Sequence, residues 1–227
     1  MNELASLLAL DFFRNAVVAA LLASVLCGVV GTFVVLKRLV AASGGIAHAA
    51  FGGLGAFYFL GWPPRLGAVA VAGAAALALS GAARSDRRQD AAIGVIWAVG
   101  MAIGLVFIHL TPGYAPSLMG FLFGDILLVS PADLWLAAGA DLVVLAHVLL
   151  FGRRIVAVAF DEECARLQGI AVRAYSLLLL LLTALAVVVL LALVGIVLVI
   201  ALLTLPPLVS LRLFRGLGAV VAGATMV

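Results

Sequence analysis

His48 is the residue best placed to carry chemistry, because it stands about eight positions into a long apolar stretch of the sequence. An ionisable side chain inside a membrane span is costly to bury, so it usually has a function. Gly44 and Gly52 stand four positions before and after it and share its helix face. The imidazole therefore projects from a stripe with few side chains, open to a ligand. The alternative is that the glycines allow tight helix packing and His48 bonds a neighbouring carbonyl.

Two carboxylates could complete a metal site with His48. Asp141 stands midway through the fifth apolar stretch, and Asp125 stands in a segment rich in glycine and proline. Imidazole and carboxylate ligands together suit zinc, iron and manganese. We therefore expect His48, Asp125 and Asp141 as candidate metal ligands. For Asp141 the alternative is a structural ion pair or cap within the helix bundle.

The sequence argues against an enzyme. Ser43 and His48 are five positions apart, about 140° around a helix, so they cannot form a nucleophile and base pair. Lys37 is the only lysine, and no glycine-rich loop precedes it, which excludes a Walker motif. The chain is thus expected to bind no cofactor. If it moves a solute uphill, the energy comes from an ion gradient or from another subunit.

The elements that position these residues are apolar helices. Of 227 residues, 67% are hydrophobic and 10% are charged, against roughly 25% charged in a soluble domain. Apolar stretches of about 20 residues, the length that spans a bilayer, follow one another. We predict an all-α, polytopic transmembrane helix bundle forming a single domain, residues 1–227. The predicted spans are residues 13–36, 40–60, 66–83, 91–110, 132–151, 174–193 and 195–213, with an eighth beginning near Gly218.

Basic residues cluster in alternate connections between these spans, with Arg65 as the exception, and this predicts which connections are cytoplasmic. No basic residue precedes the first span, which favours a retained helix over a signal peptide. The outer connection 111–131 is expected to dip into the protein at membrane depth. The inner connection 155–173 is charged, and we expect it to form a short cytoplasmic helix that docks a partner.

Pro206 and Pro207 interrupt the last long apolar run. Two successive prolines remove two backbone donors, and broken helices often line a translocation path in membrane proteins. We therefore predict a helix break there, with an ordinary helix end before Arg212 as the alternative.

Five segments, taken together, resemble one family of membrane proteins. They are CGVVGTFVVLKR at 27–38, IAHAAFGG at 46–53, LFGDIL at 122–127, AFDEECARLQGI at 159–170 and LVGIVLVIALLTLPP at 193–207. In this order they resemble the membrane permease subunit of bacterial ABC-type divalent metal importers, which transport zinc, manganese or iron.

The resemblance implies a fold like that of type II ABC importers, with about seven to eight spans in the bacterial cytoplasmic membrane. It implies three partners: a second copy of the chain, cytoplasmic ATP-binding subunits that hydrolyse ATP, and an extracytoplasmic metal-binding protein. No nucleic acid is expected. The coupling loop, about 155–173, would fit a groove on the ATPase through Asp161, Glu162, Glu163, Ala165 and Gly169.

The chain departs from the family at two positions around His48. Gly44 stands where the family commonly has an acidic residue, and Gly52 replaces a proline. The expected metal site thus loses a carboxylate, which mildly favours zinc by ligand softness. Two other functions remain open: a secondary transporter driven by an ion gradient, with His48 and Asp141 as relay, and a structural membrane scaffold.

Overall fold

The computed structural model describes residues 10–82, 86–112 and 122–227, and every regular element in these ranges is helical. Six of the helices in these ranges are long and apolar enough to cross a membrane, which confirms the multi-pass bundle. The elements are α2 (Asp11–Leu36), α3 (Val40–Phe59), α4 (Pro64–Ala82), α5 (Asp86–Leu110), η1 (Ile126–Leu128), α7 (Pro131–Phe160), α8 (Glu162–Leu167), α9 (Val172–Leu213) and α10 (Leu217–Met226).

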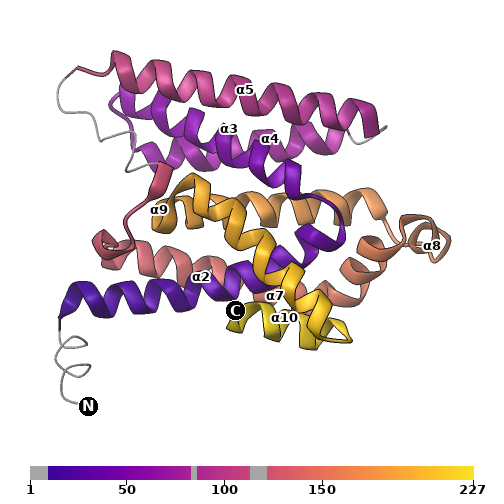
Figure 1. Ribbon diagram of the computed structural model, residues 1–227. Helices are drawn as coiled ribbons and strands as arrows, with labels where there is room; N and C mark the ends of the chain where they lie inside the picture. The colour runs from indigo at the N-terminus through magenta and orange to yellow at the C-terminus, as the bar shows by residue number, and fades with distance from the viewer. Residues whose placement is uncertain (1–9, 83–85, 113–121) are drawn as a thin grey trace.

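Helix α9 makes two passes. Its 42 residues would span about 63 Å if straight, twice the hydrocarbon thickness. Gly195, with φ 79° and ψ 167°, is not helical, and Figure 1 shows the chain reversing direction within α9. With the other five spans, the two halves of α9 give seven passes, and α10 begins at the predicted start of the eighth. The predicted spans 174–193 and 195–213 are thus joined by a tight corner at Gly195.

Two groups of helices flank α9 (Figure 1). On one side, α3 packs against α4 and α5, while on the other α2 packs against α7 and α10. Helix α9 contacts α2, α3, α4, α7 and α10, so it forms the centre of the core. His48 therefore belongs to one group and Asp141, on α7, to the other.

Glycines bring the α3 backbone very close to its neighbours. A Cβ added at Gly52 would lie 2.6 Å from the Gly100 carbonyl oxygen of α5, and one added at Gly53 would lie 2.2 Å from the Gly67 oxygen of α4. Neither site has room for a side chain. For Gly52, tight helix packing is therefore the reason for the residue.

The break predicted at Pro206 and Pro207 needs correction, because α9 continues helically through both residues. Both prolines are buried, and α2 packs against this turn through Gly31, whose added Cβ would lie 2.5 Å from the Leu203 oxygen. Packed neighbours let a membrane helix accommodate prolines. The interruption lies at Gly195 instead.

The bundle has two distinct ends, which we call the α8 end and the Gly195 end. At the Gly195 end, η1 packs on α2, and Arg65 pairs with Asp133 at 2.6 Å, which gives the one basic residue outside the predicted pattern a partner. At the other end, α7 continues to Phe160, so residues 155–160 of the expected inner loop belong to this helix. Residues 113–121 of the expected re-entrant segment lie outside the described residues.

Candidate functional site

His48 lies inside the bundle with 9% of its surface exposed. Its Nδ1 is 2.8 Å from the Gly44 carbonyl oxygen, one helical turn earlier. A carbonyl only accepts hydrogen bonds, so Nδ1 carries the hydrogen and donates it. In the neutral ring Nε2 then keeps its lone pair, the arrangement typical of a histidine that binds a metal through one nitrogen and is oriented through the other.

Trp97 of α5 covers the face of His48. The two rings are stacked with centroids 4.4 Å apart and an interplanar angle of 25°. The indole also fills the space beside Gly44, where an added Cβ would lie 2.8 Å from Trp97 Cζ3. The residue that replaces the acidic group thus makes room for an aromatic ring. Sequence reasoning missed Trp97, because a tryptophan in an apolar span has no distinguishing pattern.

Asp141 is a second ionisable group in the bundle, with 6% of its surface exposed. Neither of its carboxylate oxygens has a hydrogen-bond partner in the described chain. The Cys27 thiol of α2 lies within electrostatic reach of it. No ion pair or cap accounts for Asp141 among the described residues, so the structural alternative lacks a partner.

The three predicted ligands occupy separate places. Helix α7, which carries Asp141, packs on α2, α8 and α9, whereas α3 packs chiefly on α4, α5 and α9. Asp125 is exposed and caps η1, accepting a hydrogen bond from the Leu127 amide at 3.0 Å. Within the described ranges, no three His, Cys, Asp or Glu side chains gather closely enough to hold a metal ion. A site formed by all three residues is not assembled in the single chain, and their role as ligands stays a prediction.

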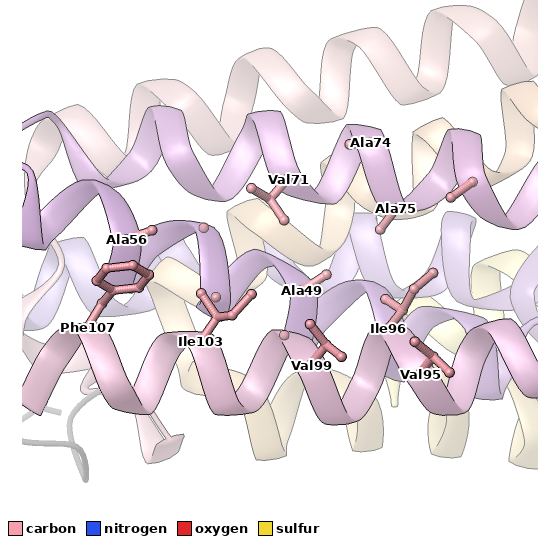
Figure 2. A pocket seen from close by; sticks show the side chains of 14 residues that line it. Ala49, Ala56, Val71, Ala74, Ala75, Val95, Ile96, Val99, Ile103 and Phe107 are labelled. Carbon is pink, nitrogen blue, oxygen red and sulfur yellow. The ribbon is translucent and has the colours of Figure 1, made fainter.

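A cleft of about 550 Å³ opens between α3, α4 and α5. Figure 2 shows its walls, among them Ala49, Val71, Ile96 and Phe107. All of its lining residues are glycine, alanine, valine, isoleucine or phenylalanine. None of these side chains has a polar atom that could replace the water molecules around a divalent ion. The cleft is therefore unsuited to the passage of such an ion.

A polar groove of about 730 Å³ lies at the α8 end. Charged side chains from three helices, α5, α8 and α9, and from the connection between α2 and α3 line it. They are Lys37, Arg38, Asp90, Glu162, Arg166 and Arg173. The groove brings the predicted inner loop, 155–173, together with the basic residues Lys37 and Arg38, so those two segments share one end of the bundle.

Helix α8 is the short helix expected in the inner loop. Asp161 caps its start, accepting hydrogen bonds from the Glu163 and Cys164 amides at 2.9 Å. Ala165 is buried against Val158 of α7 in a small apolar cluster. Gly169 ends it with φ 77°, a conformation that favours glycine. Glu162, Glu163 and Arg166 are exposed, so α8 presents charged side chains on its outer surface.

Fold and site define a multi-pass membrane permease: apolar helices span the bilayer, and one end carries a polar groove beside a short, capped surface helix. The possible nucleophile Ser43 donates to the Val40 carbonyl at 2.8 Å and not to His48, so the catalytic pair that the spacing excluded is absent. The family model for the ABC 3 transport family matches residues 9–227. The chain belongs to the ABC 3 transport family, and it is a transport component of the bacterial inner membrane and not an enzyme.

The relatives agree in sequence and in fold. The chain is 40% identical to an uncharacterized membrane protein of Synechocystis over 95% of its own length and 77% of that protein. It is 35% identical to the manganese transport system membrane protein MntC of Halalkalibacterium halodurans, covering 97% of the chain and 76% of that protein. The solved structure of PsaBC from Streptococcus pneumoniae, in complex with Fab, matches with a TM-score of 0.86 and 26% identity, over 98% of the chain and 80% of that one.

Proposed function

We propose that this chain is the membrane-spanning subunit of an ATP-driven importer that moves a divalent metal ion, zinc, manganese or iron, into the bacterial cytoplasm. Membership of the ABC 3 family supports the class of transporter. The observation that supports a metal as the transported ion is the buried His48, whose Nδ1–H bonds the Gly44 carbonyl oxygen, so that in the neutral ring Nε2 keeps the lone pair that can bind a metal.

Manganese is the first candidate for the transported ion, because relatives such as that of Halalkalibacterium halodurans are named for manganese transport. The chemistry of the site leans toward zinc, since a lone imidazole beside an aromatic ring offers no carboxylate oxygen. Asp141 supplies a carboxylate elsewhere in the bundle. Competition among the three ions for uptake decides between these preferences.

The α8 end is the cytoplasmic face in this proposal, in keeping with the basic residues there. Cytoplasmic ATP-binding subunits dock on α8, and Asp161, Glu162, Glu163, Ala165 and Gly169 form or shape the docking helix. A second copy of the chain completes the membrane pathway, and an extracytoplasmic metal-binding protein delivers the ion to the Gly195 end. The permease itself binds no cofactor.

The alternative, an ion-gradient-driven secondary transporter, needs a proton relay between His48 and Asp141. Their helices belong to different groups of the bundle, which argues against a direct relay. The family is also one of ATP-driven transporters, as its description indicates.

The test is metal uptake by the reconstituted transporter, with its ATPase and binding protein, carrying His48→Ala. His147 of α7 is a matched control, because its Nδ1 also lies 2.8 Å from a carbonyl oxygen one turn earlier, that of Val143, but its side chain is partly exposed. We expect His48→Ala to abolish saturable uptake and His147→Ala to leave it unchanged. Equal uptake by the two variants would contradict a role for His48 in the transport pathway.

A further inference from the structure

The only lysine of the chain connects α8 to the α2–α3 corner, which consists of Lys37, Arg38 and Leu39. Lys37 Nζ donates to Glu162 Oε1 at 2.5 Å and to the Val158 carbonyl oxygen at 3.4 Å. Its side chain is only 10% exposed. The ion pair joins segments 125 positions apart in sequence.

The same corner holds a strained residue. Helices α2, α3 and α8 each end on a residue in the left-handed conformation, and two of these residues are Gly61 and Gly169, with φ 72° and 77°. The third is Arg38, with φ 57°, the only non-glycine residue with positive φ in the described chain. A side chain makes that conformation unfavourable. Arg38 thus holds a conformation for which glycine is better suited, while lining the groove beside α8.

We propose that the Lys37–Glu162 ion pair transmits movement of α8 to the α2–α3 corner, which makes Lys37 a positioning residue for transport. This inference rests on the proposed function, because it assumes that an ATPase moves α8. Among the described helices, α8 packs chiefly on α7 and to a smaller extent on α9, with no comparable packing on α2 or α3. Lys37 is thus its direct link to α2 and, through the corner, to α3.

The corner leads directly to the candidate metal site. Helix α3 begins at Val40, and His48 lies eight residues later, about 12 Å along the helix axis. The Ser43 amide bonds the Leu39 carbonyl oxygen at 2.8 Å, which makes the corner continuous with the first turn of α3. A shift of α8 that pulls on Lys37 therefore moves the start of the helix that carries His48.

A stabilising role alone predicts a different outcome. Glu162 is 52% exposed, and ion pairs that are exposed to this extent contribute little to stability. Removing the pair should then change neither folding nor transport to any great degree. Transmission of movement predicts instead that ATP hydrolysis continues while fewer ions cross for each ATP.

The experiment compares Lys37→Gln, Glu162→Gln and the charge swap Lys37→Glu with Glu162→Lys in the full reconstituted transporter. The control is Arg65→Gln, which removes an interhelical ion pair of 2.6 Å at the Gly195 end. Zinc or manganese uptake and ATP hydrolysis are measured in the same vesicles. We expect the single variants to lower the ions transported per ATP about fivefold or more, the charge swap to restore much of the ratio, and Arg65→Gln to leave it unchanged.

A wild-type ratio in Lys37→Gln would overturn the inference, as would an equal loss in Arg65→Gln. Thermal unfolding in detergent separates these results from misfolding, since the charge swap retains a pair at the same place. If wild-type vesicles show no ATP-driven uptake, the proposed function fails. If the wild type is active and the ratio does not respond to the pair, the inference alone fails.

Discussion

Gly44→Ala separates the role of the His48–Trp97 stack from the stability of the fold. The added Cβ would lie 2.8 Å from Trp97 Cζ3, too close for both groups to stay in place. Trp97 is 40% exposed, and the clash is with the far end of its side chain, so the indole can move away. The perturbation therefore removes the stack on His48 without forcing the helices apart.

The two energetic consequences of this substitution nearly cancel in stability. Loss of an aromatic pair costs about 0.5–1.5 kcal/mol, while replacing glycine by alanine within a helix contributes about 1 kcal/mol. The thermal midpoint of Gly44→Ala should thus stay close to that of the wild type. If the stack orients the imidazole for the ion, the same 0.5–1.5 kcal/mol corresponds to a half-saturating metal concentration about two- to tenfold higher.

The assay is ATP-driven metal uptake by Gly44→Ala, Trp97→Ala and the double variant. Gly45→Ala is the matched control, because its added Cβ would meet Ile93 Cγ2 at an ordinary 3.5 Å. We expect each single variant to raise the half-saturating concentration, the double variant to be no worse than either, and Gly45→Ala to match the wild type. Gly44→Ala behaving like Gly45→Ala, or additive effects in the double variant, would refute the reasoning.

Two further predictions concern the core. Gly195→Ala should prevent stable folding, because φ 79° strains any side chain and the added Cβ would lie 2.4 Å from the Gly124 nitrogen. The control Gly139→Ala, whose added Cβ meets nothing within 4 Å, should unfold at or above the wild-type temperature. A stable Gly195→Ala would contradict the tight corner at Gly195. Asp141→Leu should raise the free energy of unfolding by about 1–3 kcal/mol, because it removes a buried carboxylate without a described partner; a lower thermal midpoint in detergent would show that the carboxylate is satisfied.

The passes and the corner could be predicted from sequence because they depend on local features. Apolar length sets each span, and a glycine between two such runs, as at Gly195, permits a reversal. The C-terminal end of α7 and the helical conformation of the two prolines could not be predicted in this way. The predicted fifth span ends at residue 151, just before Arg153 and Arg154, but α7 carries both arginines and continues to Phe160. Pro206 and Pro207 suggested a break that packing against α2 makes unnecessary.

The contacts of the site could not be predicted, because they join distant parts of the chain. Nothing local pairs Lys37 with Glu162 or stacks Trp97 on His48. The spacing around His48 did identify a face of α3 with small residues. It did not decide whether the absence of a side chain at Gly44 makes room for a ligand or allows close helix packing. In the structure, the indole ring of Trp97 fills the space beside Gly44.

The central claim is that ATP hydrolysis by another subunit moves a divalent ion through this bundle. The most direct measurement is uptake of labelled manganese or zinc into proteoliposomes that contain the complete transporter. ATP is supplied either on the α8 side of the membrane or on the opposite side, and ion gradients are either imposed or dissipated. We expect uptake that requires ATP on the α8 side, persists without any ion gradient and is lost in His48→Ala. Uptake that continues without ATP and stops when the proton or sodium gradient is dissipated would contradict the claim.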